Sequence, residues 1–472
     1  MELGSRQDPQ LREVVRFAVC CRALTLLLQA LFNFLIPDHA ADAFSPPRLS
    51  DPGPWDLLVE QLLGGLSHWD AEHFLFIAER GYLYEHNCAF FPLYPLCLRA
   101  VAEAAPGPLR QLLRLRSRLL LSVVLLNSLF SILAAAALFK LGCSVLRCRG
   151  TAFLAALLFS ISPANVFMAA AYSESVFAVL SFSAMWQLEQ GWGSLSGVLF
   201  SLASGARANG VLNAGFFLYS RGRRFALQLQ YYAYMKFCGP SPERDVPEPL
   251  LQLALDKGYR LAATEGVQPP WCSQRLPVVY SYIQDVYWNV GFLRYFELRQ
   301  IPNFLLASPV TLLGLWAAWT YVTSNPRHCL TLGLERRKAE GEDKPRAGFC
   351  SPAVFVYVVH ATVLLVFGFF CMHVQVLTRF LCSSSPVLYW FCAHLLQEHE
   401  PLLWNEGTSD QTVTPLTGNA PGPGGESSCG NPLLVLLRGR GSIAPLSRGL
   451  LGFFLTYCLL GLALHCNSLP WT

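Results

Sequence analysis

The sequence has 472 residues, of which 53% are hydrophobic and 14% are charged, whereas ordinary soluble domains have roughly 45–50% and 25%. The mean hydropathy is +0.37, and apolar runs long enough to cross ~30 Å of hydrocarbon recur along the whole chain. The composition therefore excludes an ordinary soluble protein and predicts one all-α, polytopic membrane domain over residues 1–472. The net charge of +4 comes from short basic clusters, so nucleic acid is not an expected partner.

The chain contains sixteen cysteines, and most of them lie inside apolar runs. In such surroundings a cysteine usually acts as a small apolar side chain. We therefore do not expect a disulfide framework. No CxxC pair has a matching pair of His or Cys residues, so a structural zinc site is not expected either.

The first long apolar run, Val14–Ile36, is preceded and entered by arginines, among them Arg6, Arg12 and Arg16. This positive charge predicts a cytosolic N-terminus. Because the run is longer than the ~7–15 residues of a signal-peptide core, we expect an uncleaved membrane anchor.

The later apolar runs are often interrupted by Pro, Gly, Arg or Glu. Between the basic residues Arg149 and Arg221, both predicted to be cytosolic, the number of crossings must be even, but three apolar runs lie there. The last of these runs, Ser194–Tyr219, contains Arg207 and Asn209. We therefore expect two short helices that meet near Arg207 and Asn209, where polar backbone lines a cavity within the protein. The other runs are Leu119–Leu141, Ala152–Ala171, Ser173–Leu188, Pro302–Val322, Ala353–Cys371, Val374–Leu396 and Leu450–Leu464.

Charge and composition also predict the character of the connecting segments and the side of the membrane on which some of them lie. Basic residues mark residues 323–350 as a cytosolic loop, and residues 37–118 then form a first lumenal loop. Residues 240–300 are mixed in polarity and rich in aromatic residues, and we expect a second lumenal loop there. Residues 398–447 are rich in Pro, Gly, Ser and Thr, which is typical of a flexible loop.

The candidate chemistry begins with the string HWDAEHF at residues 68–74, with AFFPLYP close behind it at residues 89–95. On the predicted lumenal side, Asp70 is well placed to deprotonate a hydroxyl group while a lipid-borne leaving group stays in the bilayer. The alternative is that the acidic residues of this string are simply solvated. His68 and His73 are five residues apart, so the helical metal-binding pair at i and i+4 is absent.

Three polar clusters interrupt later apolar runs. Glu174 lies within the letters YSES and Arg207 within RANG, and ionisable groups at membrane depth are costly and often functional. The alternative for these two residues is a structural ion pair with each other. In the third cluster, beside His373 and Gln375, Arg379 suits the phosphate of a lipid carrier. The alternative there is that its side chain extends to the membrane interface.

These strings, together with SPANVF at residues 162–167, WNVG at 288–291, IPNF at 301–304 and the C-terminal LHCNSLPWT, resemble the PIG-V family of GPI mannosyltransferases. The resemblance covers nearly the whole chain. It implies a GT-C-like helical bundle in which a lumenal loop carries the catalytic carboxylate. It also implies transfer of the second mannose, α1,6-linked, from dolichyl-phosphate mannose to the mannosylated glucosaminyl-phosphatidylinositol precursor, at the lumenal face of the endoplasmic reticulum membrane.

The resemblance further implies inversion at the transferred sugar, because the donor is β-linked and the product α-linked. One base is enough for a single displacement, and we assign it to Asp70. Arg379, with Arg207 as second choice, offsets the charge that develops on the leaving phosphate. Neither a metal nor a cofactor is expected. The residues expected to bind substrate are His68, Trp69, Glu72, Glu174, Arg207, Asn209, Asn303, Gln375 and Arg379.

Two other functions are weighed against this one: a non-catalytic membrane protein, such as a lipid transporter or an assembly subunit, and a dolichol-dependent mannosyltransferase with a different acceptor. One departure from the family favours the first. The family carries a longer apolar segment before Gln230, where this chain has only Ser220–Leu229. One crossing is also missing from the topology, and the candidate for it, Phe225–Gly239, contains two glutamines and a lysine. The sequence names no subunit partner in the endoplasmic reticulum membrane.

Overall fold

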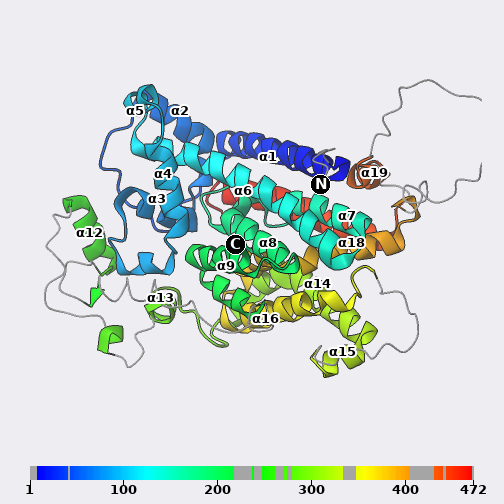
Figure 1. The fold of residues 1–472 in the computed structure, drawn as a ribbon. Helices are drawn as coiled ribbons and strands as arrows, with labels where there is room; N and C mark the ends of the chain where they lie inside the picture. Colours follow the sequence, from blue (N-terminus) through cyan, green and yellow to red (C-terminus); the bar gives the residue numbers. More distant parts are fainter. Residues whose placement is uncertain are drawn as a thin grey trace, which may run out of the picture.

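The computed structural model describes residues 8–40, 43–216, 237–238, 247–260, 270–273, 279–332, 347–403, 430–439 and 443–469. This part of the chain is helical and contains no strand, which confirms the predicted all-α class (Figure 1). Five of its helical segments are long and apolar enough to cross a membrane. They contain α1 (Pro9–Leu35), α6 (Leu115–Leu146), α14 (Ile301–Ser324), α16 (Phe355–Cys371) and α20 (Pro445–His465).

Shorter helices connect these five and cover their ends. Two of them, α7 and α9, are apolar but short. The shorter α-helices are α2 (Pro54–Leu63), α3 (Asp70–Arg80), α4 (Leu93–Glu103), α5 (Gly107–Leu112), α7 (Arg149–Ser160), α8 (Glu174–Glu189), α9 (Gly193–Ala206), α12 (Glu248–Lys257), α13 (Val279–Trp288), α15 (Pro326–Leu330), α17 (Leu377–Ser384), α18 (Val387–His399) and α19 (Pro432–Arg438).

Helix α6 lies at the centre of the bundle, where it packs against α1, α7 and α8. Its inner side carries small residues: Ala134 is fully buried, and a Cβ added to Gly142 would lie only 2.9 Å from the Cβ of Ala152. Small residues let helices approach closely, which stabilises helix pairs in a membrane, where burial of apolar surface contributes little. On the outer side, Leu125 and Leu129 are 59% and 47% exposed, and this side is the one suited to lipid.

The predicted span Ala152–Ala171 is broken in the structure. Helix α7 ends at Ser160, because Pro163 lacks a backbone N–H and cannot continue the helix. A buried turn and the 3₁₀ helix η3 (Asn165–Met168) follow. This run is therefore one of those that proline interrupts, and the break brings polar groups such as Asn165 into the protein interior.

The predicted span Val374–Leu396 is also divided. Helix α17 ends at Ser384 and α18 begins at Val387, with Ser385 extended at φ −125° and ψ 129°. A residue before proline is pushed toward this extended conformation, and Pro386 is the next residue. This run is thus also interrupted by proline, and the division leaves α17 as a short helix with buried polar residues such as Thr378 and Ser383.

The predicted break within Ser194–Tyr219 is confirmed as far as the structure describes this run. Helix α9 ends at Ala206, and Arg207 is extended, with φ −152° and ψ 148°. The 3₁₀ helix η4 (Ala208–Asn213) then continues the chain. The predicted crossing within 225–239 lies almost entirely outside the described residues.

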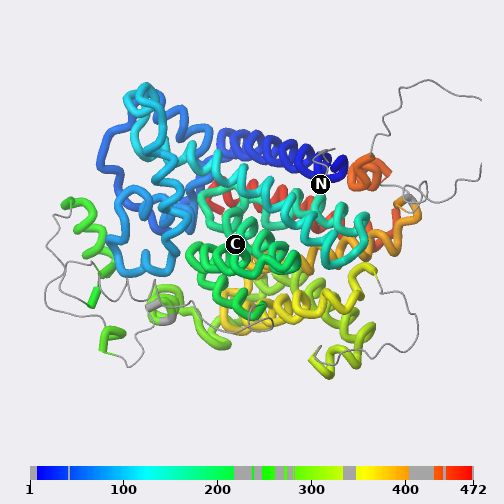
Figure 2. The backbone as a smooth tube through the Cα atoms, viewed as in Figure 1, coloured from blue at the N-terminus to red at the C-terminus, as the bar shows by residue number. Residues whose placement is uncertain are grey.

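The two predicted lumenal loops lie at the same end of the bundle. Helices α2 to α5 and helices α12 and α13 gather there, while the start of α1, together with α15 and α19, lies at the opposite end (Figures 1 and 2). This is the arrangement that the basic clusters predict. Residues 323–350 and 398–447 are described only in part. Which end faces the lumen stays a prediction.

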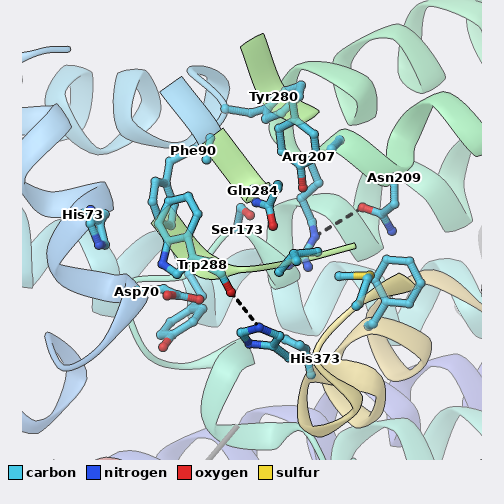
Figure 3. Close-up of a pocket in the computed structure, with 18 of the residues that line it drawn as sticks. Asp70, His73, Phe90, Ser173, Arg207, Asn209, Tyr280, Gln284, Trp288 and His373 are labelled. Atoms are coloured by element: carbon cyan, nitrogen blue, oxygen red, sulfur yellow. Dashed lines mark hydrogen bonds between the residues drawn. The ribbon is translucent and has the colours of Figure 1, made fainter. Parts of the chain in front are cut away.

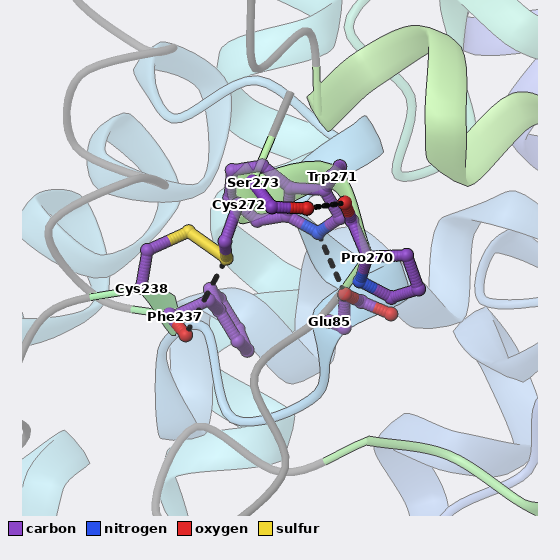
Figure 4. The surroundings of a disulfide bond; sticks show 7 residues. All are labelled: Glu85, Phe237, Cys238, Pro270, Trp271, Cys272 and Ser273. Carbon is purple, nitrogen blue, oxygen red and sulfur yellow. Dashed lines mark hydrogen bonds between the residues drawn. A yellow bond between two sulfur atoms is a disulfide. The ribbon is translucent and has the colours of Figure 1, made fainter. Parts of the chain in front are cut away.

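A disulfide bond that the sequence analysis did not expect joins Cys238 to Cys272, which are 34 residues apart (Figure 4). Next to it, Trp271 is fully buried and its indole N–H donates to Oε1 of Glu85 at 2.9 Å. Tyr287 of α13 donates to Oε2 of the same carboxylate, also at 2.9 Å. Glu85 thus connects Trp271 and α13 to the first loop, and these hydrogen bonds fix the position of α13.

Candidate active site

A cavity of about 820 Å³ opens at the end of the bundle where the two loops meet (Figure 3). Its volume is at the upper end of the ~300–1,000 Å³ of small-molecule sites. Its walls come from α3, the start of α8, η4, α13 and α17, which are far apart in the sequence. Its polar lining includes Trp69, Asp70, His73, His86, Ser173, Glu174, Arg207, Asn209, Lys257, Tyr259, Tyr280, Gln284, Tyr287, His373, Gln375 and Arg379.

Asp70 is the first residue of α3 and projects into this cavity. The residue before it, Trp69, has φ 58° and ψ −130°. Residues other than glycine rarely adopt this backbone conformation. Strain of this kind persists where the surrounding structure fixes the residue, and it is frequent at functional sites. The strained turn at Trp69 starts the helix at the position that directs Asp70 toward the lining.

Four charged side chains form a chain along the cavity wall. Nη2 of Arg379 donates to Oδ2 of Asp70 at 2.7 Å, and Nη1 of Arg379 lies 3.9 Å from Oε1 of Glu174. Arg207 forms an ion pair with the same Glu174 oxygen. Glu174 is 1% exposed, Arg379 is 15% exposed and Arg207 is 17% exposed. Buried charges are tolerated when they are paired in this way.

This network tests two alternatives from the sequence analysis: a structural Glu174–Arg207 ion pair, and an Arg379 side chain that extends to the membrane interface. The Glu174–Arg207 ion pair does form, and both of its residues also line the cavity. Arg379 does not extend to the membrane interface, because its guanidinium packs over the rings of Phe167 and Tyr172, at 5.2 and 5.3 Å from their centres. Arginine commonly stacks on aromatic rings in this way.

The pKa of Asp70 reflects two opposing effects. Burial acts to raise the pKa of this carboxyl, whereas the nearby Arg379 charge and its hydrogen bond lower it, and the net pKa lies below the usual value. Asp70 is therefore ionised at neutral pH. Its side chain is 35% exposed, so a hydroxyl group in the cavity can reach it.

Two polar residues complete this side of the cavity. Asn209 donates from Nδ2 to the hydroxyl of Ser384 at 2.8 Å and lies 3.3 Å from Nε of Arg207. Gln375 accepts a hydrogen bond from the hydroxyl of Tyr295 at 2.8 Å. Both lie on breaks between helices, where backbone and side chains are free to face the cavity instead of a neighbouring helix.

Three residues predicted to bind substrate do not line the cavity, and their placement is corrected here. Glu72 lies two positions after Asp70, so it points away from the cavity, since successive helical residues are ~100° apart. It pairs instead with Arg116 and, at 3.4 Å, with Arg48. The other predicted residues, Trp69, Glu174, Arg207, Asn209, Gln375 and Arg379, line the cavity together with Asp70.

The other two corrections concern His68 and Asn303. His68 contacts the backbone oxygen of His465 at 3.2 Å through Nδ1, because it precedes the strained turn and faces the end of α20. Asn303 donates to the hydroxyl of Tyr295 at 2.8 Å. Tyr295 in turn holds Gln375, so Asn303 acts on the cavity only through two other side chains.

Sequence reasoning missed several lining residues. His73 is three positions after Asp70 and therefore on the same helix face, a spacing that could have identified it. His86, Lys257, Tyr259 and Tyr280 belong to segments that only the folded chain brings to the cavity. No local pattern pointed to them.

Among the described residues no group of three or more His, Cys, Asp or Glu could hold a metal ion. The absence of a metal requirement stays a prediction.

A helical membrane bundle with a charged, water-accessible cavity where apolar helices end is suited to an enzyme that acts on lipid-linked substrates. The chain belongs to the PIG-V family of mannosyltransferases: the family model described as Mannosyltransferase (PIG-V) matches residues 11–229 and 225–472. The protein is therefore a glycosyltransferase, and the resemblance drawn from its motifs is confirmed.

Similar proteins are found in mammals and in insects. The chain is 58% identical to GPI alpha-1,6-mannosyltransferase 2 of Homo sapiens over 500 positions, covering 99% of each chain. It is 58% identical to the protein of the same name from Cricetulus griseus over 497 positions, covering 98% of this chain and 99% of the other. GPI mannosyltransferase 2 of Drosophila melanogaster is 33% identical over 417 positions, covering 81% and 90%.

The alignment with the human protein has more positions than the 472 residues of this chain. The relative therefore carries residues that have no counterpart here. The two stretches of the family match also meet at residues 225–229, within the region where the sequence analysis found the chain shorter than its family. This region lies outside the described residues.

Proposed function

We propose that this protein transfers mannose from dolichyl-phosphate mannose to a glycosylphosphatidylinositol precursor, forming an α1,6 linkage, at the lumenal face of the endoplasmic reticulum membrane. The names of the similar proteins support the reaction and its linkage. The observation that carries the proposal is the contact between Asp70 and Arg379 inside the cavity, since it places a base beside a cation suited to a phosphate.

In the proposed reaction, Asp70 takes the proton from the acceptor mannose 6-hydroxyl. The hydroxyl oxygen forms a bond to C1 of the donor mannose as the bond from C1 to the phosphate oxygen breaks. The electron pair of that bond leaves with dolichyl phosphate. A single displacement of this kind inverts the configuration at C1, as a β-linked donor and an α-linked product require.

Arg379 couples the two halves of this reaction. Its charge is offset by Asp70 at 2.7 Å and, more weakly, by Glu174 at 3.9 Å. Once Asp70 is protonated, the attraction between the two side chains falls, and the guanidinium is left to stabilise the negative charge on the leaving phosphate. Arg207, already paired with Glu174, is the second candidate for that role.

The lumenal location rests on two observations. The disulfide Cys238–Cys272 lies at the cavity end of the bundle, and disulfides persist in oxidising compartments such as this lumen and are rare in the cytosol. The basic residues of the opposite end suit the cytosolic side.

The orientation can be tested with the variants Arg327→Cys and Asp256→Cys. An impermeant thiol reagent should label Arg327→Cys in cells with opened plasma membranes, but Asp256→Cys only after detergent is added. The reverse pattern would overturn the orientation.

The activity is tested with purified protein in lipid vesicles. The substrates are dolichyl-phosphate mannose and a synthetic mannosyl-glucosaminyl-inositol phospholipid. We expect a product that is one hexose heavier and that an α1,6-specific mannosidase restores to the starting acceptor. Transfer that resists this mannosidase would contradict the linkage. Transfer from a nucleotide sugar in place of the dolichol donor would contradict the donor.

A further inference from the structure

The cavity extends beyond the charged residues to a second region, here called the histidine lobe and formed by Phe44, His73, His86, Lys257, Tyr259 and Tyr287. Figure 3 shows His73 on one side of Asp70, with Arg207 and Asn209 on the other. The proposed mechanism uses the arginine side and leaves the histidine lobe without a role.

His86 is the most unusual residue of the histidine lobe. It is 2% exposed, yet neither of its ring nitrogens has a hydrogen-bond partner in the described part of the chain. Its ring contacts Tyr259, with centres 4.3 Å apart, and Tyr287, with centres 5.5 Å apart. Buried polar atoms almost always have partners in a folded protein. Because His86 also lines the cavity, a ligand that binds there can supply the missing partners.

His73 supports the same reading. Its ring is stacked between Phe44 and Phe90, with centres 4.3 and 4.4 Å away, so only its edge can reach a ligand. Its centre lies 5.2 Å from that of His86. Burial lowers the pKa of His73 to about 4 and that of His86 to about 2. Both rings are therefore neutral at pH 7, and each offers one N–H donor and one nitrogen acceptor.

We infer that the histidine lobe binds a sugar ring of the acceptor glycan, adjacent to the mannose that receives the new residue, through hydrogen bonds between its hydroxyl groups and His86. This inference rests on the proposed function. Sugar hydroxyls both donate and accept, as a neutral imidazole requires, whereas a phosphate oxygen would leave the acceptor nitrogen unsatisfied. The surrounding aromatic rings suit the apolar C–H faces of a sugar.

The acceptor is favoured over the donor because of the geometry of inversion. In a single displacement the attacking hydroxyl and the leaving phosphate lie on opposite faces of the reacting carbon. If the phosphate lies near Arg379 and Arg207, the rest of the acceptor must extend away from them past Asp70. The histidine lobe is the part of the cavity on that side.

The test compares His86→Phe, which keeps an aromatic ring but removes both nitrogens, with the wild type. Two acceptors are used with the dolichol donor: the full mannosyl-glucosaminyl-inositol phospholipid and a simple alkyl mannoside that lacks the neighbouring sugars. We expect the KM for the full acceptor to rise about tenfold, as for the loss of one or two hydrogen bonds. The KM values for the alkyl mannoside and for the donor should stay within about twofold.

His360→Phe is the matched control. His360 is also a buried histidine whose two ring nitrogens have no partner among the described residues, but it lies on α16 and does not line the cavity. It should leave all three KM values unchanged. His86→Asn, which restores one donor and one acceptor, should return the KM for the full acceptor toward that of the wild type, which separates hydrogen bonding from packing.

Several results would overturn the inference while the proposed function stands. These are an unchanged KM for the full acceptor in His86→Phe, a rise confined to the donor, and an equal rise in His86→Phe and His86→Asn. If the wild-type protein itself transfers no mannose to the full acceptor, the proposed function fails, and the inference fails with it.

Discussion

Asp70 and Glu72 are acidic residues of the same helix, two positions apart, and the structure gives them opposite surroundings. Asp70 is 35% exposed, lines the cavity and contacts one arginine, Arg379. Glu72 is 9% exposed and is held outside the cavity by Arg116 and Arg48. The two carboxylates therefore differ in access: Asp70 keeps one side open to the cavity, whereas Glu72 is enclosed by its arginine partners.

The largest effect is expected from Asp70→Asn. If Asp70 is the general base, turnover should fall by about 10²–10⁴-fold, because the amide cannot take the acceptor proton. The amount of folded protein and the binding of donor should persist. Asp51→Asn, in an exposed part of the same loop, serves as the control and should keep full activity. Near-normal turnover of Asp70→Asn in the vesicle assay would contradict the assignment of Asp70 as the general base.

Arg379→Gln should lower turnover by about 10²-fold, because in the proposed reaction the Arg379 charge stabilises the leaving phosphate. It should also change the pH profile. The proposed reaction requires ionised Asp70, whose pKa is raised by burial and lowered by Arg379. Without Arg379 the pKa rises, so the acid limb of kcat/KM moves to higher pH.

Arg379→Lys is the control for this shift, since it keeps the charge but lacks the two guanidinium nitrogens that lie near Asp70 and Glu174. Its acid limb should lie closer to that of the wild type. The coupling between the two residues is contradicted by an acid limb that stays in place in Arg379→Gln.

Glu72→Gln should give the opposite phenotype to Asp70→Asn. It leaves Arg116, whose side chain is 11% exposed, without its carboxylate, and an unsatisfied buried group costs about 2 kcal/mol of stability. The thermal unfolding midpoint of the purified protein should fall, while turnover per folded molecule stays near that of the wild type. Loss of turnover at an unchanged unfolding midpoint would mean that Glu72, and not Asp70, is the general base.

The smallest effect is expected from His68→Asn. His68 lies next to Trp69 in the sequence but outside the cavity, and its Nε2 is 3.8 Å from an exposed Asp38 carboxylate. Such a contact contributes little, and the hydrogen bond of Nδ1 with the His465 backbone oxygen contributes about 0.5–1.5 kcal/mol. The free energy of unfolding should therefore change by less than about 1.5 kcal/mol. Acceptor and donor KM values should not change. A large rise in either would return His68 to the substrate-binding residues.

The sequence predicted the charged residues of the site better than their orientations. Glu174 and Arg207 stood out because ionisable groups inside apolar runs are costly, and both do line the cavity. Glu72 was included because it belongs to the same string as Asp70, but helical geometry turns it away. His86 was missed, since a single histidine in a loop carries no signal until its surroundings are known.

The class of fold, the apolar helices and the family follow from the amino-acid sequence, because hydrophobicity and long motifs are local properties of the chain. The packing of the folded chain, in contrast, turns Arg379 on α17 toward Asp70. It also decided which face of α3 meets the cavity. These features depend on the packing of segments about 300 residues apart, as the 309-residue separation of Asp70 and Arg379 illustrates, and no local pattern records such a contact.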